Sequence, residues 1–350
     1  MLKKFLLILV LPSFLILGLV AVKPVMADLP TGNRLKDPYA ILRNALPIEQ
    51  KELRQLQNTL EDISGDLRGN RWPALSKAAS KSLFIASNKK KQILDAIPQN
   101  NKQKGEDILM NLKNNLEQLS QQASSKNKSE FIEIRRTSLQ QIGTLESLLL
   151  TNKFPYEIPS KFDNLPRLLG RANVEIKTNK GSMIATIDGY NAPLTSGAFI
   201  DLALKGFYDK LPINRAEEFF ILQTGDPVGE EIGYMDPDTK EIRNVPLEIR
   251  VPGEQEIMYN ETFEEAGLYT STPVLPFATL GTLGWAHSDK SLDDGSSQFF
   301  FFLYEAELNP AGRNLIDGRN AAFGYVIEGS EILNKLGVND EIISVKVLDG

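Results

Sequence analysis

The chain has 350 residues, enough for two domains of ordinary size or one large one. Its composition, 42% hydrophobic and 24% charged, excludes a disordered polyelectrolyte, a collagen-like fibre and a multi-span membrane protein. The net charge of −6 gives no general attraction to nucleic-acid phosphates. Because there is no cysteine and only one histidine, His287, the sequence excludes disulfides, thiol nucleophiles and multi-histidine metal centres.

The first 27 residues have the pattern of a secretory signal peptide. Two lysines precede an apolar run over residues 5–22, and Val25-Met26-Ala27 offers small residues at a cleavage position. We expect cleavage after Ala27, which lowers the net charge to −9, and export to a periplasm or a lumen. The alternative is an uncleaved membrane anchor, although the run is close to the minimum spanning length and Pro12 interrupts it.

Residues 28–152 are predicted to be helical. Apolar residues such as Leu53, Leu56 and Leu60 recur at spacings of three and four, so that each set forms one stripe along a helix. Breaks at residues 64–70, 98–101 and 124–128 separate four such stretches. Four amphipathic helices joined by short loops predict a four-helix bundle. The run Lys89-Lys90-Lys91 is either a contact patch or a solvated helix face.

A proline-rich linker over residues 153–172 separates the helical half from a half with strand-like patterns. Alternating residues predict a β-hairpin within 174–187, and further strands near 218–223, 298–303, 323–327 and 342–348. Short helices are expected at 198–203 and 330–336. Many short strands with two helices predict a closed antiparallel barrel. The predicted fold class is therefore α+β, an N-terminal four-helix bundle followed by a β-barrel domain over 173–350.

Four segments of this second half occur in the order seen in one family. They are Ala192-Pro193-Leu194-Thr195 with Gly206-Phe207-Tyr208-Asp209, Asn214-Arg215 with residues 219–227, Gly295-Ser296-Ser297-Gln298-Phe299-Phe300, and residues 316–324. Residues 173–350 thereby resemble the cyclophilins, which are peptidyl-prolyl cis-trans isomerases. The resemblance implies an eight-stranded antiparallel barrel with two helices. The whole layout resembles the thylakoid-lumen cyclophilins of plants and cyanobacteria, which are associated with photosystem II assembly.

Prolyl isomerisation needs no nucleophile, metal or cofactor. The barrier of about 18–20 kcal/mol comes from delocalisation of the nitrogen lone pair, and a donor aimed at that nitrogen stabilises the twisted state selectively. The resemblance implies that Arg215 is this donor, that Gln223 orients it, and that Phe220, Ile221 and Phe300 line the proline pocket. Taken singly, the phenylalanines fit a core and the arginine fits a surface ion pair; their joint spacing favours a site.

Three departures from the family pattern weaken the catalytic prediction. Leu315 stands where the family has its pocket tryptophan, which removes one wall and the expected cyclosporin contact. Asn320 stands at the pocket histidine, and Asn214 stands where the family has a histidine before the arginine. His287 falls near a position whose backbone grips the substrate, so we expect it to contact substrate rather than to act as a base. Ser288 beside it lacks the GxSxG context of a hydrolase nucleophile.

Residues 230–265 form an acidic insertion, with 11 acidic against 3 basic residues. It is either a solvated loop, a docking segment for a basic partner, or a segment that folds over the protein's own helical half. Its carboxylates suggest Ca²⁺, but the regular DxDxDG loop is missing. No metal site is therefore predicted.

These features predict a peptidyl-prolyl isomerase-type assembly factor for proline-containing lumenal loops of photosystem II membrane proteins, with weak to moderate activity. The alternative is an inert binding scaffold with a degraded pocket. A third interpretation is an ordinary periplasmic isomerase whose bundle mediates dimerisation. Arg215 and Gln223 favour activity, whereas Leu315 and Asn320 favour the scaffold.

Overall fold

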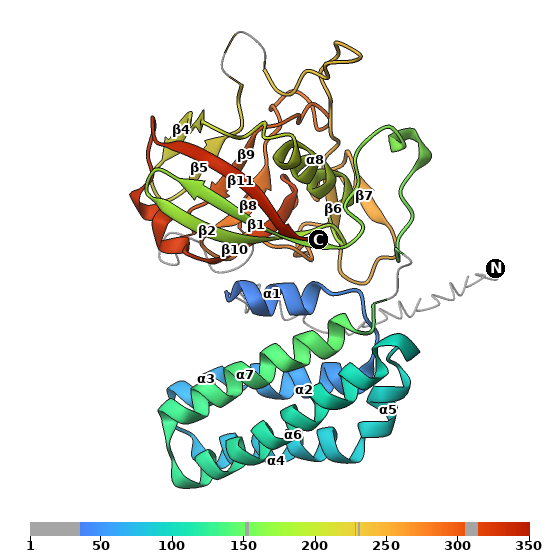
Figure 1. The fold of residues 1–350 in the computed structure, drawn as a ribbon, viewed down its shortest axis with the longest axis vertical. Helices are drawn as coiled ribbons and strands as arrows, with labels where there is room; N and C mark the ends of the chain where they lie inside the picture. Colours follow the sequence, from blue (N-terminus) through green and yellow to red (C-terminus); the bar gives the residue numbers. More distant parts are fainter. Residues whose placement is uncertain (1–35, 151–153, 228, 230–231, 305–313) are drawn as a thin grey trace, which may run out of the picture.

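The computed structural model describes residues 36–150, 154–227, 229, 232–304 and 314–350. A helical region and a curled β-sheet domain follow one another along the chain, and helix α1 lies between them (Figure 1). The predicted signal peptide over residues 1–27 falls outside the described residues. Within the described ranges, no helix has the length and apolar character needed to cross a membrane.

Four long helices build the helical region: α2 (Lys51–Glu61), α4 (Trp72–Asn88), α6 (Lys102–Ser125) and α7 (Lys128–Ser147). Their predicted apolar stripes face inward, and Leu53, Leu56, Leu112 and Leu116 are fully buried. The break expected at 64–70 contains the short helix α3 (Ser64–Arg68). The long stripe after Trp72 is interrupted near Lys89, and α5 (Lys90–Asp95) and the 3-10 helix η1 (Gln99–Asn101) then turn the chain toward α6.

Helix α1 (Pro38–Ala45) belongs to the predicted bundle segment but packs against the sheet domain. Asp37 caps its N-terminus, accepting from the Tyr39 backbone N–H, and Pro38 occupies the first turn, where no intrahelical donor is needed. Its buried Ile41, Leu42 and Ala45 belong to a cluster whose other residues come from the sheet domain. The predicted helical segment 28–152 thus contains one helix, α1, whose apolar residues are buried against the sheet domain.

The second half is a nine-stranded antiparallel sheet in the order β3-β11-β1-β2-β10-β8-β9-β5-β4. The strands are β1 (Arg171–Thr178), β2 (Gly181–Asp188), β3 (Leu211–Pro212), β4 (Arg215–Glu217), β5 (Ile221–Thr224), β8 (Thr282–Trp285), β9 (Phe299–Phe302), β10 (Ala322–Glu328) and β11 (Glu341–Asp349). The expected hairpin is β1–β2. The sheet has nine strands, one more than the expected eight, and the short strands β3 and β4 form its two edges.

Two helical segments accompany the sheet, as the resemblance implies. Helix α8 (Pro193–Leu204) is buried along most of its length and packs against β11, β10 and β2. The second segment, η3 (Ser330–Lys335), is a 3-10 helix rather than an α-helix. It follows Gly329, whose φ of +74° is a left-handed conformation that glycine adopts without steric cost.

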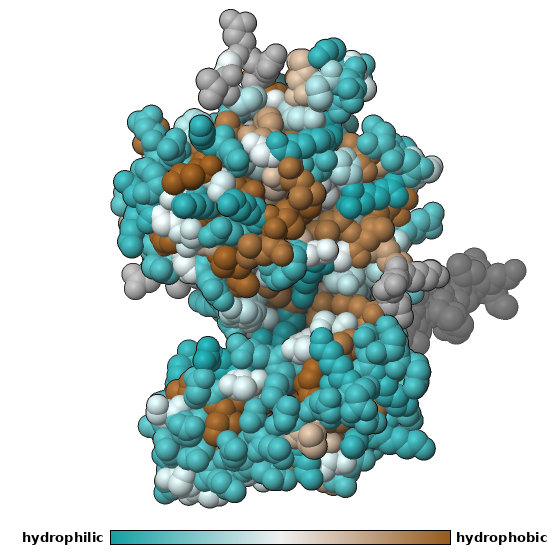
Figure 2. Space-filling view, in the orientation of Figure 1, coloured by the Kyte–Doolittle hydropathy of each residue, from teal (hydrophilic) through white to brown (hydrophobic). Residues whose placement is uncertain are grey.

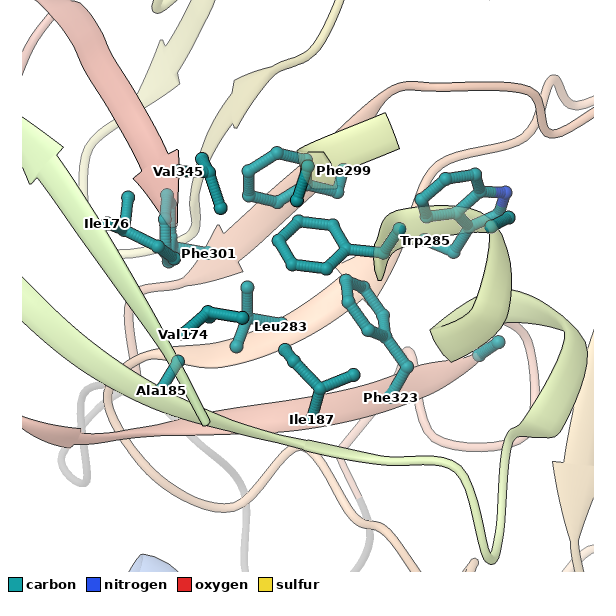
Figure 3. Close-up of a cluster of buried hydrophobic side chains, with 14 of the residues drawn as sticks. Val174, Ile176, Ala185, Ile187, Leu283, Trp285, Phe299, Phe301, Phe323 and Val345 are labelled. Carbon is teal, nitrogen blue, oxygen red and sulfur yellow. The ribbon is translucent and has the colours of Figure 1, made fainter. Parts of the chain in front are cut away.

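The core of this domain lies inside the curled sheet. Figure 3 shows side chains from several strands converging there, among them Leu283, Phe299, Phe301 and Phe323. Because side chains alternate across a strand, the run of four phenylalanines in β9 divides between two faces. Phe299 and Phe301 enter this core, whereas Phe300 and Phe302 join the separate cluster that contains α1. The alternation thus places Phe300 on the outer face.

The described part of the acidic insertion includes regular secondary structure. It contains a two-stranded sheet, β6 (Glu248–Arg250) with β7 (Ile257–Tyr259). Glu248 is buried and its Oε1 accepts from the Thr195 backbone N–H at 2.5 Å, in the first turn of α8. A carboxylate there satisfies an orphan donor and complements the helix dipole. Burial raises the pKa of Glu248 to about 7.

The linker also packs on the sheet domain. Ile158 and Phe162 lie against its core, and the short η2 helix (Ser160–Phe162) interrupts the linker. Figure 2 shows a mostly hydrophilic bundle surface in this view, whereas hydrophobic residues gather on the sheet domain.

No ion pair among the described residues joins the acidic insertion to the bundle. The expected contact between the two stays a prediction.

Candidate active site

Strand register brings the predicted site residues into rows on the outer face of four neighbouring strands. In β4–β5, Arg215 pairs with Gln223; in β5–β9, Gln223 pairs with Phe300; and in β9–β8, Phe300 pairs with Gly284. Gly284 gives room for the aromatic ring, since a Cβ there would lie 2.2 Å from Phe300 Cζ. The next row, in the same strand order, is Glu217, Ile221, Phe302 and Thr282.

Arg215 lies at the exposed edge of these rows. About half of its side chain is exposed. Its Nη1 lies 3.5 Å from Gln223 Oε1, at the limit of a hydrogen bond. Its Nε and Nη2 donate to Glu217 Oε1 at 2.7 and 2.5 Å. The structure thus places Gln223 beside the guanidinium, as the resemblance implies, and adds a carboxylate that the sequence reasoning did not assign.

A chain of side-chain amides fixes Gln223. Its Nε2 donates to Gln298 Oε1 at 2.7 Å, and Gln298 Nε2 donates to Asp226 Oδ1 at 2.8 Å. Burial raises the pKa of Asp226, partly offset by hydrogen bonds from Asn214 and Gln298. With its amide nitrogen engaged, Gln223 turns its oxygen toward Arg215.

A cavity of about 260 Å³ adjoins the hydrogen-bonded side chains of Gln223 and Gln298. It is lined by Gln223, Ile232, His287 and Gln298, among others. His287 Nδ1 lies 2.8 Å from the Ser288 carbonyl oxygen, and Nε2 lies 2.9 Å from that of Arg319. Both neighbours are acceptors, and a neutral imidazole carries one N–H, so one of the two contacts is a hydrogen bond that the ring donates. The cavity brings His287 to the same surface as Gln223.

The apolar residues of the predicted pocket are more covered than the resemblance implies. Ile221 and Phe300 are only 4% and 5% exposed. Phe300 stacks on Phe277, with ring centroids 5.7 Å apart and planes at 14°. Phe220 is half-buried and meets Phe302 edge-on. The cluster that holds Ile221 and Phe300 also includes Ile41 of α1.

Two of the three departures from the family pattern, Leu315 and Asn320, do not belong to this apolar cluster. Leu315 is 76% exposed, so its side chain forms no buried wall. Asn320 is half-buried, and its Nδ2 donates to the Trp285 carbonyl oxygen at 3.3 Å. Neither residue supplies the aromatic or imidazole group that the family has there. In the described part of the chain, no group of three or more acidic or histidine side chains is arranged to hold a metal ion.

The sequence reasoning missed three residues that shape the site: Glu217, Phe277 and Gln298. Strand alternation could have revealed Glu217, because residues two apart on a strand share a face. Gln298 stands directly before the Phe299-Phe300 pair, so its alternation with Phe299 also predicts an outward position. Phe277 gave no signal, since it lies in a loop 23 residues before Phe300 in the sequence.

Two family models match the chain. Residues 37–150 match the model described as peptidyl-prolyl cis-trans isomerase CYP38-like, PsbQ-like domain. Residues 173–346 match the model described as cyclophilin type peptidyl-prolyl cis-trans isomerase/CLD. A solved cyclophilin-type isomerase from Cryptosporidium parvum is 21% identical, with a TM-score of 0.37, and the match covers 51% of this chain and 99% of that one.

Similarity to two curated proteins extends over both halves. A putative thylakoid lumen peptidyl-prolyl cis-trans isomerase, sll0408, from Synechocystis is 45% identical over 93% of this chain and 86% of its own length. The chloroplastic isomerase CYP38 from Arabidopsis thaliana is 37% identical over 93% of this chain and 78% of its own. The chain therefore belongs to the cyclophilin family of peptidyl-prolyl cis-trans isomerases, in the group that joins a PsbQ-like helical domain to the cyclophilin domain.

Proposed function

We propose that the protein is a lumenal assembly factor that binds proline-containing loops of photosystem II membrane proteins and isomerises their prolyl bonds with weak to moderate activity. One relative is named a thylakoid lumen isomerase and the other a chloroplastic isomerase, which supports a lumenal location, and a periplasm fits the same export signal. The PsbQ-like helical domain supports a link to photosystem II. No cofactor is required for this chemistry, and the net charge of −6 gives no general attraction to nucleic acid.

The observation that carries the proposal is the row formed by Arg215, Gln223 and Phe300. A peptide laid along this row would bring its prolyl nitrogen beside the guanidinium and its ring toward the aromatic residue. As the bond twists, the nitrogen lone pair localises and accepts a hydrogen bond that neither planar state can make. A thousandfold acceleration requires about 4 kcal/mol of selective stabilisation.

The test is cis-trans exchange, measured by NMR on synthetic peptides that copy lumenal loops, with full-length exported protein. We expect faster exchange than in buffer alone for loops with an Xaa-Pro bond, and weaker binding of the matched peptides in which alanine replaces proline. Equal binding of both peptides together with unaccelerated exchange would overturn the proposal.

A second candidate function is a binding scaffold without useful isomerase activity. It is favoured by the burial of Ile221 and Phe300 and by the outward position of Leu315. In this case the proline peptide would bind near Gln223 and His287 but its exchange rate would stay at the uncatalysed value. The same experiment therefore separates the two candidates.

A further inference from the structure

The carboxylate of Glu217 accepts two hydrogen bonds from one side of the Arg215 guanidinium. Arg215 and Glu217 are two residues apart on β4, so both side chains lie on the same face. One carboxylate oxygen, Oε1, accepts from Nε at 2.7 Å and from Nη2 at 2.5 Å. A guanidinium has five N–H donors, and this contact uses two of them.

The carboxylate competes with Gln223 for the orientation of Arg215. The distance from Nη1 to Gln223 Oε1 is 3.5 Å, which is longer than both contacts with the Glu217 carboxylate. The guanidinium is charged in both contacts, but only Glu217 adds an opposite charge to short hydrogen bonds. The ion pair with Glu217 therefore sets the resting direction of the guanidinium, with Gln223 as the weaker partner.

The same carboxylate weakens Arg215 as a donor. A positive group stabilises a localised lone pair through its field as well as its hydrogen bond, and an adjacent negative charge cancels part of that field. Both side chains are about half exposed, 50% for Arg215 and 46% for Glu217. Solvent therefore screens the pair, which limits the effect and makes it sensitive to salt.

We propose that Glu217 is a positioning residue that holds Arg215 in a resting ion pair and thereby attenuates isomerase turnover. The inference rests on the proposed isomerase function. The pair must loosen before the full set of guanidinium donors and their charge face the prolyl nitrogen. Loosening of the ion pair lowers the free energy of the transition state more than that of the bound peptide. We therefore expect removal of the pair to change kcat rather than KM.

The experiment compares Glu217→Gln with the matched control Glu218→Gln in the full-length protein. Both variants remove one negative charge from neighbouring exposed residues, but Glu218 makes no ion pair among the described residues. The substrate is a blocked Xaa-Pro peptide without charged side chains. We expect Glu217→Gln to raise kcat about three- to fivefold with KM changed less than twofold, as removal of an exposed pair allows. Glu218→Gln should match the wild type.

Two further measurements separate this effect from a general change in charge. Raising the salt concentration should increase the turnover of the wild type toward that of Glu217→Gln and leave the variant unchanged. In an Arg215→Ala background, Glu217→Gln should have no effect. An active wild type whose kcat is unchanged or lowered by Glu217→Gln would overturn the inference and leave the isomerase function standing. Exchange at the uncatalysed rate in every variant would overturn both.

Discussion

Arg171 at the start of β1 donates from Nη2 to the carbonyl oxygen of Leu42 in α1, at 2.6 Å and across 129 residues of sequence. The same guanidinium binds the buried carboxylate of Asp188, with Nη2 2.5 Å from Oδ2. Asn191 adds a hydrogen bond from Nδ2 to the Ala45 carbonyl oxygen at 2.9 Å. The sheet domain thus satisfies carbonyl groups at the C-terminal end of α1, where a helix has no partners of its own.

The bundle satisfies the neighbouring carbonyl groups of the same helix end. Arg54 of α2 donates to the carbonyl oxygen of Arg43 at 2.9 Å and to that of Leu46 at 2.6 Å. Two cations at the negative end of the helix dipole add a favourable interaction. Helix α1 is therefore fixed from both sides, and it couples the position of the bundle to that of the sheet.

Arg171→Met should lower the free energy of unfolding by about 3 kcal/mol. The substitution leaves Asp188, whose side chain is fully buried, without its cation, and a buried charge without its partner is strongly destabilising. It also removes the bond to Leu42. Equilibrium unfolding in urea measures the change.

The control is Arg167→Met. Arg167 forms an ion pair with Asp163, whose side chain is 67% exposed, and exposed pairs contribute less than about 1 kcal/mol. Equal losses in the two variants would show that the contact between Arg171 and Asp188 is no stronger than a surface ion pair.

The stripes of the bundle and the main strands could be predicted because each rests on a local repeat. Leucines at helical spacing must face a common core, and the alternating residues of β1 and β2 must do so across a strand. The site residues Arg215, Gln223 and Phe300 could be named from the order of the family motifs along the chain. That they are neighbours across the strands depends on strand register, which the sequence of a single segment does not reveal.

The position of α1 could not be predicted from the sequence. Its eight residues include four buried apolar ones, Ala40, Ile41, Leu42 and Ala45, and so short a pattern fits any neighbouring surface. What places it is a set of bonds from Arg171 and Asn191, more than a hundred residues away. The pairing of Arg215 with Glu217 was also missed, because exposed charges of opposite sign are common on strands and rarely define a site.

Arg215→Ala should reduce isomerase turnover by about a hundredfold or more, while the melting transition stays intact. Removal of one preorganised donor to a developing charge typically costs this much, and the exposed Arg215 side chain contributes little to the fold. Arg215→Lys should recover only part of the rate, because lysine lacks the planar fork. Unchanged turnover in Arg215→Ala with an unaltered melting curve would rule out the mechanism.

Cyclosporin should bind this protein poorly. Leu315 is 76% exposed and offers neither the indole donor nor the flat face that the family's tryptophan supplies. Loss of such an aromatic anchor typically costs a few kcal/mol of binding free energy. Calorimetry should detect no submicromolar binding to the wild type and a partial gain of affinity in Leu315→Trp. Submicromolar binding to the wild type would contradict the prediction.

The free energy of unfolding should depend on pH through Glu146 of α7, whose carboxylate lies beside Arg54 near the end of α1. Its side chain is fully buried, its Oε1 lies 3.3 Å from Arg54 Nη1, and its Oε2 has no hydrogen-bond partner among the residues that the structure describes. Burial raises the pKa of this carboxyl group to about 7, and the nearby cations Arg54 and Arg43 only partly offset the cost. In the unfolded chain the same group would titrate near its ordinary value of 4.5.

A raised carboxyl pKa means that the folded protein binds the proton more tightly than the unfolded chain between pH 4.5 and about 7. This group therefore stabilises the fold below pH 4.5, and its contribution is lost as the pH rises to about 7, by on the order of 2–3 kcal/mol. Glu146→Gln removes the titration and should flatten this part of the pH dependence in urea unfolding at pH 5 and pH 8. Glu248, whose pKa is also raised to about 7, would still contribute to the pH dependence of stability in this variant.

The control is Glu133→Gln on the same helix, since Glu133 is 55% exposed in its pair with Arg136. A pH dependence in Glu146→Gln as steep as that of the Glu133→Gln control would exclude Glu146 as its source.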